Sequence, residues 1–209
     1  LHVVWSDSWG FIPNVLNKGL AIESTAAFPF LLARGLGSSH EVTDQFGSYE
    51  VVGPGVELAA TLTTLIGVLV LLTLFGLRLV GRLANAVTGD LVLLAVLIFV
   101  ATHKINSVQY GVWIAAMTAG ALTFTGSRVR GPAVLLTLVL LLASWSIWPN
   151  FIPLTGGNII FLGYQGIRLV LLLVAIAWLA KTVFWDEGTS RHDPVQQSQR
   201  SQVSDLGPF

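Results

Sequence analysis

The sequence contains no cysteine and carries few charged residues of either sign. The lack of cysteine excludes disulfides, thiolate chemistry and cysteine-ligated metal sites. Charged residues make up 11% of the 209 residues, whereas soluble domains average about 25%. Lys and Arg total 11, as do Asp and Glu, and this zero net charge argues against nucleic acid as a partner. With 54% hydrophobic residues and a mean hydropathy of +0.75, the composition indicates a membrane protein.

The four histidines show no metal-ligand spacing such as H-E-x-x-H. They are scattered at His2, His40, His103 and His192. We therefore predict no bound metal and no cofactor. The chain starts at Leu1, without an initiator Met or a signal-peptide pattern. We expect it to be the C-terminal part of a longer protein.

Five apolar runs could cross a bilayer, a distance that takes about 20 helical residues. They are Val56–Val80, Leu91–Ala101, Val108–Phe124, Ala133–Trp148 and Asn158–Ala180. The Leu91 run is short and has to borrow residues from its flanks. The sequence predicts an all-α polytopic membrane protein with a bundle of about five transmembrane helices over residues 55–180. The polar residues 181–209 are predicted to form a disordered tail.

Residues 1–54 contain no spanning run, so we expect them to lie outside the bilayer. Apolar residues at helical spacing predict a helix over about 13–34, bent at Pro29. Glu23 falls in the middle of this helix. Either the helix is interfacial and Glu23 faces water, or it is re-entrant and points Glu23 into a cavity. Residues 36–54 are rich in Gly and Ser and then alternate between polar and apolar, which predicts a short hairpin or an extended loop outside the bilayer.

A dense polar stretch, residues 102–113, separates the second and third apolar runs. If residues 108 onward are helical, four side chains share one face at i, i+3, i+4 and i+7: Asn106, Gln109, Tyr110 and Trp113. Two amides, a phenol and an indole suit a carbohydrate-like ligand. His103 and Lys104 add possible cations at the membrane edge, where charge needs a partner or water. The alternative is that Lys104 marks the membrane edge and the amides join helices.

Basic residues beside the spans predict the orientation, since they concentrate on the cytoplasmic side. The residues concerned are Arg78 and Arg82, Arg128 and Arg130, and Lys181, Arg191 and Arg200 in the tail. Residues 1–54, the polar stretch and residues 149–157 are then extracytoplasmic. This prediction brings Glu23 and the 103–109 side chains to one face of the membrane.

Arg168 lies about ten residues into the last predicted span. An arginine there needs an anion or a water-filled cavity, and its planar guanidinium suits phosphate. The alternative is that Arg168 extends to the outer headgroups.

Three stretches resemble the bacterial glycosyltransferase family 87. Lys18–Ala27 resembles that family's Arg-Gly-Leu-Gln-Ile-Glu-Ser-Val stretch, and Phe46–Gly55 is similar to the segment that follows it. His103–Tyr110 resembles Asn-Lys-x-x-Ser-Pro-Gln-Tyr, and an arginine early in the last span is also similar. The resemblance covers roughly residues 8–180. The chain departs from the pattern at Lys18, Ala21, His103, Val108 and Ala115–Ala116.

The resemblance implies a GT-C fold and a hexosyltransferase, most simply a mannosyltransferase, at the extracytoplasmic face of the plasma membrane. It would move a sugar from a polyprenyl-phosphate donor to a glycolipid or glycan acceptor. The implied substrate-binding residues are Glu23, His103, Lys104, Asn106, Gln109, Tyr110 and Arg168. The general base is expected upstream of Leu1, so no catalytic residue is assigned in this chain. The rival functions are a transporter or flippase for lipid-linked or anionic solutes, and a non-catalytic membrane scaffold.

The predicted orientation can be tested by labelling, because the chain has no native cysteine. Cysteines introduced at Ser107 and Gly156 should react with a membrane-impermeant thiol reagent in intact cells, and one at Asn85 should not. Labelling at Asn85 alone would invert the orientation and move the predicted site to the cytoplasm.

Overall fold

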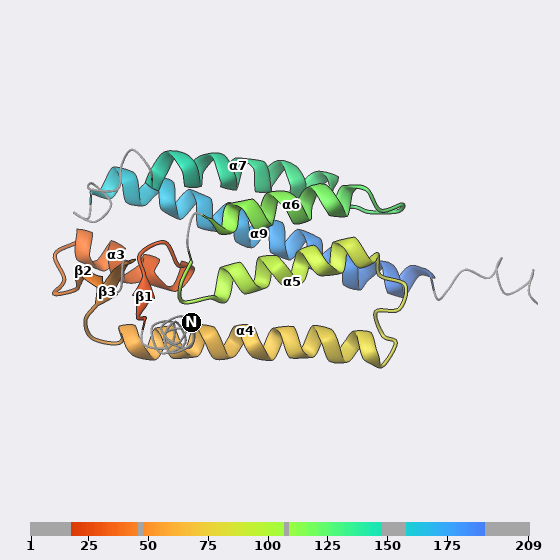
Figure 1. Cartoon of the computed structure of the whole chain (residues 1–209), viewed down its shortest axis with the longest axis horizontal. Helices are drawn as coiled ribbons and strands as arrows, with labels where there is room; N and C mark the ends of the chain where they lie inside the picture. The colour runs from red at the N-terminus through yellow and green to blue at the C-terminus, as the bar shows by residue number, and fades with distance from the viewer. Residues whose placement is uncertain (1–17, 46–47, 107–108, 148–157, 191–209) are drawn as a thin grey trace, which may run out of the picture.

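In the computed structural model, an elongated bundle of helices carries a small β-containing unit at one end (Figure 1). The structure describes residues 18–45, 48–106, 109–147 and 158–190. The small unit comprises residues 18–55, and we call it the outer unit. The bundle is formed by α4 (Val56–Leu79), α5 (Thr88–Thr102), α6 (Tyr110–Leu122), α7 (Arg130–Ile147) and α9 (Ile159–Ser190).

The outer unit contains a three-stranded antiparallel sheet in the order β1-β3-β2. Strands β2 (Glu41–Gln45) and β3 (Ser48–Val52) form the predicted hairpin, in which Gln45 is opposite Ser48. The two-residue strand β1 (Leu20–Ala21) pairs with the other edge of β3. A short 3-10 helix, η1 (Thr25–Ala27), leads into α3 (Phe28–Gly35). The hairpin prediction is confirmed.

The helix predicted over residues 13–34 is wrong in the part that the structure describes. Residues 20–21 are extended, and the α-helix begins only at Phe28. Pro29 does not bend a helix but lies in the first turn of α3, where its missing N–H group would have no intrahelical partner. The apolar pattern that predicted this helix arises from the core of the outer unit. Its residues Leu20, Ile22, Ala27 and Leu31 are buried together in the core of the outer unit, from different local structures.

The five bundle helices alternate in direction. Figure 1 shows the outer unit, the start of α4, the end of α5 and the start of α9 at one end, with the 80–87 and 123–129 connections at the other. Apolar residues of α5 form much of the central core, including Leu93, Leu94 and Leu97, and α5 packs against α4, α6 and α9. At the far end the buried Asp90 carboxylate accepts hydrogen bonds from the Ser127 hydroxyl (2.6 Å) and the Arg128 N–H (3.0 Å). This ties α5 to the connection before α7.

Two helices are long and apolar enough to cross a membrane: Val56–Leu79 and the Leu162–Trp185 part of α9. Only 17% and 33% of their most apolar windows are buried, whereas the core helix of a soluble protein would be mostly covered. The apolar helices Thr88–Thr102, Tyr110–Leu122 and Arg130–Ser144 are shorter. The prediction of five spans is therefore supported for two helices and not for the other three.

Two further boundaries differ from prediction. Helix α6 begins at Tyr110, so Asn106 precedes it in the connection after α5 and does not share a helical face with Tyr110. The chain leaves α5 at His103, whose backbone is extended. Helix α9 continues to Ser190, which corrects the disordered tail over residues 181–190. The rest of that tail, and the loop predicted at 149–157, lie outside the described residues.

The closest approach of α4 to α5 depends on a glycine. A Cβ atom at Gly67 would lie 2.1 Å from the Thr102 hydroxyl oxygen and 2.8 Å from its Cβ, whereas one at Gly76 would meet nothing within 4 Å. Glycine at position 67 therefore permits the two helices to pack.

We expect Gly67→Ala to destabilise the protein by about 1–3 kcal/mol, because α4 must move away from α5. Gly76→Ala, on the same helix, should leave stability unchanged or slightly higher. Unfolding titrations in detergent would measure both. Adding Thr102→Ala to Gly67→Ala should restore only part of the loss, because it removes the hydroxyl contact at 2.1 Å but keeps the Cβ contact at 2.8 Å. Equal stability of the two single variants would contradict the packing explanation.

Candidate functional site

Arg168 and Glu23, 145 residues apart in the sequence, meet where α9 passes the outer unit. The Arg168 side chain is 6% exposed, and its Nη2 donates a hydrogen bond of 2.8 Å to the Glu23 backbone carbonyl. The Glu23 carboxylate also lies in the electrostatic field of the guanidinium. Arg168 therefore lies beside Glu23, but the hydrogen bond joins it to the backbone carbonyl of Glu23 and not to the carboxylate.

Glu23 lies in the turn between β1 and η1, not within a helix. Burial raises the pKa of its carboxyl group above the usual 4.5, because desolvation disfavours the charged form. A backbone hydrogen bond at Glu23 and the charges of Arg168 and Lys18 oppose this effect without cancelling it. A five-residue separation along one helix would turn Lys18 and Glu23 apart by about 140°. The extended backbone at 20–21 instead keeps the two charges within interaction range.

A small cavity of about 30 Å³ brings Arg168 together with Asn106 and Tyr110. Asn106 is 6% exposed, and the cavity is closed by apolar residues of α5, α6, α7 and α9. Its volume suffices for about one water molecule. Asn106, Tyr110 and Arg168 thus line one cavity, although Asn106 reaches it from the connection and not from α6.

The other predicted residues lie around this centre. His103 belongs to an aromatic cluster with Phe99 and Tyr110, at ring-centroid distances of 4.8 and 5.9 Å. Tyr110 stacks on Trp113 at 4.7 Å. The His103 ring also hydrogen-bonds the Ile105 carbonyl through Nδ1, which fixes the course of the connection. Gln109 is exposed at the turn before α6.

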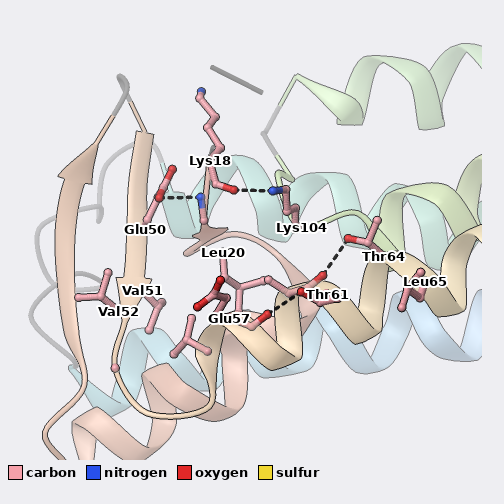
Figure 2. Close-up of a pocket in the computed structure, with 14 residues that line it drawn as sticks. Lys18, Leu20, Glu50, Val51, Val52, Glu57, Thr61, Thr64, Leu65 and Lys104 are labelled. Carbon is pink, nitrogen blue, oxygen red and sulfur yellow. Dashed lines mark hydrogen bonds between the residues drawn. The ribbon is translucent and has the colours of Figure 1, made fainter. Parts of the chain in front are cut away.

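Lys104 is directed to a different place. Its ammonium donates a hydrogen bond of 2.6 Å to the Lys18 carbonyl, and its own carbonyl accepts one of 3.0 Å from the Ala21 N–H. Figure 2 shows this contact beside the bond from the Gly19 N–H to the Glu50 carboxylate (2.8 Å). Lys104 therefore lines a cavity of about 730 Å³ between the outer unit and α4, which Arg168 does not line.

Sequence reasoning missed Gln165. Its side chain is fully buried, and among the described residues neither its amide oxygen nor its amide nitrogen has a hydrogen-bond partner. It precedes Arg168 by three residues on the continuous helix α9, so the two share a helical face. The sequence alone could have indicated this residue. An amide side chain inside an apolar span, one turn before an arginine, costs free energy to bury unless it has a hydrogen-bond partner.

The side chains around Arg168 match the chemistry of an anion with hydroxyl groups, although the cavity between them has room for only about one water molecule. Among the described residues no group of three or more potential metal ligands occurs. Arg168 offers a buried positive charge, and Asn106, Tyr110 and Gln165 offer neutral donors and acceptors. Such a mixture suits a phosphate joined to a hydroxylated group.

Comparisons of this chain with family models, with curated proteins and with solved structures found no match. The interpretation of the site therefore depends on its own geometry and on the three motifs quoted above.

The raised pKa of Glu23 predicts a pH effect on stability. Between 4.5 and the raised folded-state value, the folded protein binds more protons than the unfolded chain, so the free energy of unfolding increases as the pH falls through this window. Compared with Glu23→Gln, the wild type should therefore gain stability on acidification from pH 7 toward 4.5.

Thermal unfolding of both proteins in the same detergent, at several pH values, would measure the difference and cancel the contributions of other carboxylates. Parallel pH profiles would contradict a raised pKa at Glu23.

Proposed function

We propose that this chain forms the lipid-phosphate-binding part of a membrane glycosyltransferase of GT-C type. In this proposal the enzyme transfers a hexose, most simply mannose, from a polyprenyl-phosphate donor to a glycolipid or glycan acceptor. The outer unit lies at the extracytoplasmic face, and α5, α6 and α7 cross the plasma membrane with α4 and α9 as a bundle of five helices. No general base is assigned within this chain.

The observation that carries the proposal is the buried Arg168 beside Glu23, next to Asn106 and Tyr110. A guanidinium has five N–H donors, and the Glu23 carbonyl takes one of them. Burying this charge is costly without an anion or further hydrogen bonds. A phosphate at the end of the bundle would supply both.

The chemistry assigns different tasks to these side chains. Cleavage of the donor leaves negative charge on the departing polyprenyl phosphate, and Arg168 would stabilise it at low dielectric. The neutral groups of Asn106, Tyr110 and Gln165 would bind oxygens of the phosphate or the sugar. Because Lys104 is bonded to the Lys18 carbonyl on the other side of the 102–110 connection, we assign the phosphate to Arg168 rather than to Lys104.

The bundle geometry supports a common outer end. The connections that carry Arg82 and Arg128 lie at the end of the bundle opposite the outer unit (Figure 1). Concentration of arginine at one end accords with the cytoplasmic preference of basic residues.

A transporter is the weaker alternative. Transporter sites commonly use helices broken near the middle of the membrane. Helix α9 continues without interruption through Arg168, and α4 is also continuous over its 24 residues.

The proposal predicts that Arg168→Lys, in the complete protein, lowers sugar transfer by on the order of 10²-fold, because a point ammonium cannot reproduce the paired contacts to phosphate. The matched control is Arg82→Lys, an exposed arginine at the opposite end of the bundle, which should retain activity. Transfer of a radiolabelled sugar from polyprenyl phosphate into lipid would be measured at equal protein levels.

A thermal unfolding measurement on both variants separates loss of binding from loss of fold. Full transfer activity in a folded Arg168→Lys protein would exclude the phosphate-binding role. Absence of any transfer by the complete wild-type protein, over a panel of polyprenyl-phosphate sugars, would favour the scaffold instead.

A further inference from the structure

The cavity between the outer unit and α4 is a second polar site, separate from the Arg168 cluster. Its volume of about 730 Å³ is within the range of small-ligand sites. One wall is the end of β3 with the segment 18–20, and the other is the first three turns of α4 (Figure 2). Neither Glu50 nor Glu57, which both line it, belongs to the residues predicted from the sequence to bind substrate.

On the outer-unit side, the charged groups hold the protein's own backbone. Lys104 donates to the Lys18 carbonyl, and Glu50 accepts from the Gly19 N–H. Figure 2 shows the Lys18 side chain extending away from the cavity. This wall is therefore built as a rigid support.

Helix α4 presents a row of hydrogen-bond acceptors to the same cavity. Glu57, Thr61 and Thr64 are spaced i, i+4 and i+7, so they share one face. The Thr61 hydroxyl donates its hydrogen to the Glu57 carbonyl (3.0 Å), and the Thr64 hydroxyl donates to the Ala60 carbonyl (2.8 Å). Each hydroxyl oxygen can then offer only its lone pairs to a ligand. The row thus favours a ligand with several O–H or N–H donors.

The same cavity also has an apolar side. Val51, Val56, Ala60 and Leu65 contribute to its lining. Further along α4, large apolar side chains such as Leu69 and Leu72 are 62% and 61% exposed. A ligand with a polar head in the cavity and a hydrocarbon tail along α4 would match both surfaces.

We infer that this cavity binds the uncharged, hydroxyl-rich headgroup of a membrane lipid, that is, a sugar-headed lipid. The balance of charge favours a neutral head, because a lone phosphate would face Glu50 and Glu57, and a lone ammonium would face Lys104. In the proposed transfer reaction this lipid is the acceptor, and that assignment rests on the proposed function. The binding itself does not, since the cavity and its acceptor row are independent of Arg168.

The test is protection of a cysteine at the cavity from a charged maleimide. The full-length chain carrying Val52→Cys, at the lining of the cavity, is placed in nanodiscs of phosphatidylcholine alone or with added monohexosyl diacylglycerol, phosphatidic acid or phosphatidylethanolamine. The matched control is Asp44→Cys, an exposed position on the same hairpin that does not line the cavity.

We expect the hexosyl lipid to slow labelling of Val52→Cys by about threefold or more once most cavities are occupied, and to leave Asp44→Cys unchanged. Glu57→Gln combined with Thr61→Val should abolish the protection. Thr73→Val should not, although Thr73 makes the same kind of bond to its own helix, from its hydroxyl to the Leu69 carbonyl at 2.8 Å.

Protection by phosphatidic acid or phosphatidylethanolamine alone, equal protection by all lipids, or none would overturn the inference. If Val52→Cys does not fold, native mass spectrometry of the unaltered chain from the same discs gives the second measurement. Retention of the hexosyl lipid above its share of the disc supports the site, and retention in proportion to that share contradicts it. Neither readout measures sugar transfer. Failure of the proposed transfer reaction would therefore be distinguishable from failure of lipid binding in this cavity.

Discussion

Two cations from different helical elements hold the short segment 18–23 against the bundle. Lys104, after α5, binds the carbonyl of residue 18, and Arg168 of α9 binds the carbonyl of residue 23. Between them, the Ala21 N–H returns a hydrogen bond to the Lys104 carbonyl. Buried carbonyls need such donors, and β1 can then complete the sheet by pairing with β3. The position of the outer unit, and hence of both polar sites, depends on these contacts.

The elements with strong periodicity could be predicted from the sequence. Alternation over 41–52 gave the hairpin, and the apolar runs gave all five bundle helices to within a few residues, except for the long extension of α9 beyond Ala180. The segment before Phe28 was misinterpreted, because apolar residues at helical spacing also arise when a strand and a turn contribute to one small core. Helix length was the other limit: an apolar run shows that a helix forms, but three of the five are shorter than a membrane-crossing helix.

Site residues could be predicted where a charged side chain lies in apolar surroundings, since burying it costs free energy. They were harder to predict where the path of the backbone determines which side chains meet. Arg168 and Glu23 were each identified as charges in apolar surroundings, and the structure brings Arg168 to the Glu23 carbonyl. Asn106 reaches Arg168 from a connection whose path no spacing rule gives. Spacing within one helix could not show that Lys18 lies within charge range of Glu23 or that Glu57 lines a cavity, because both depend on elements distant in the sequence. Gln165 was overlooked, although an orphaned amide in a span is itself a signal.

Both attachments of the segment 18–23 use cations and carbonyl oxygens rather than ion pairs. A peptide carbonyl does not titrate, whereas a carboxylate loses its charge as the pH falls toward its pKa. Protonation of Glu23 would change the field around Arg168 and leave the bond to its carbonyl in place. The hydrogen bonds that attach the segment 18–23 therefore do not depend on the protonation state of Glu23. A fall in pH would then alter the charge of the site while the outer unit remains docked on the bundle.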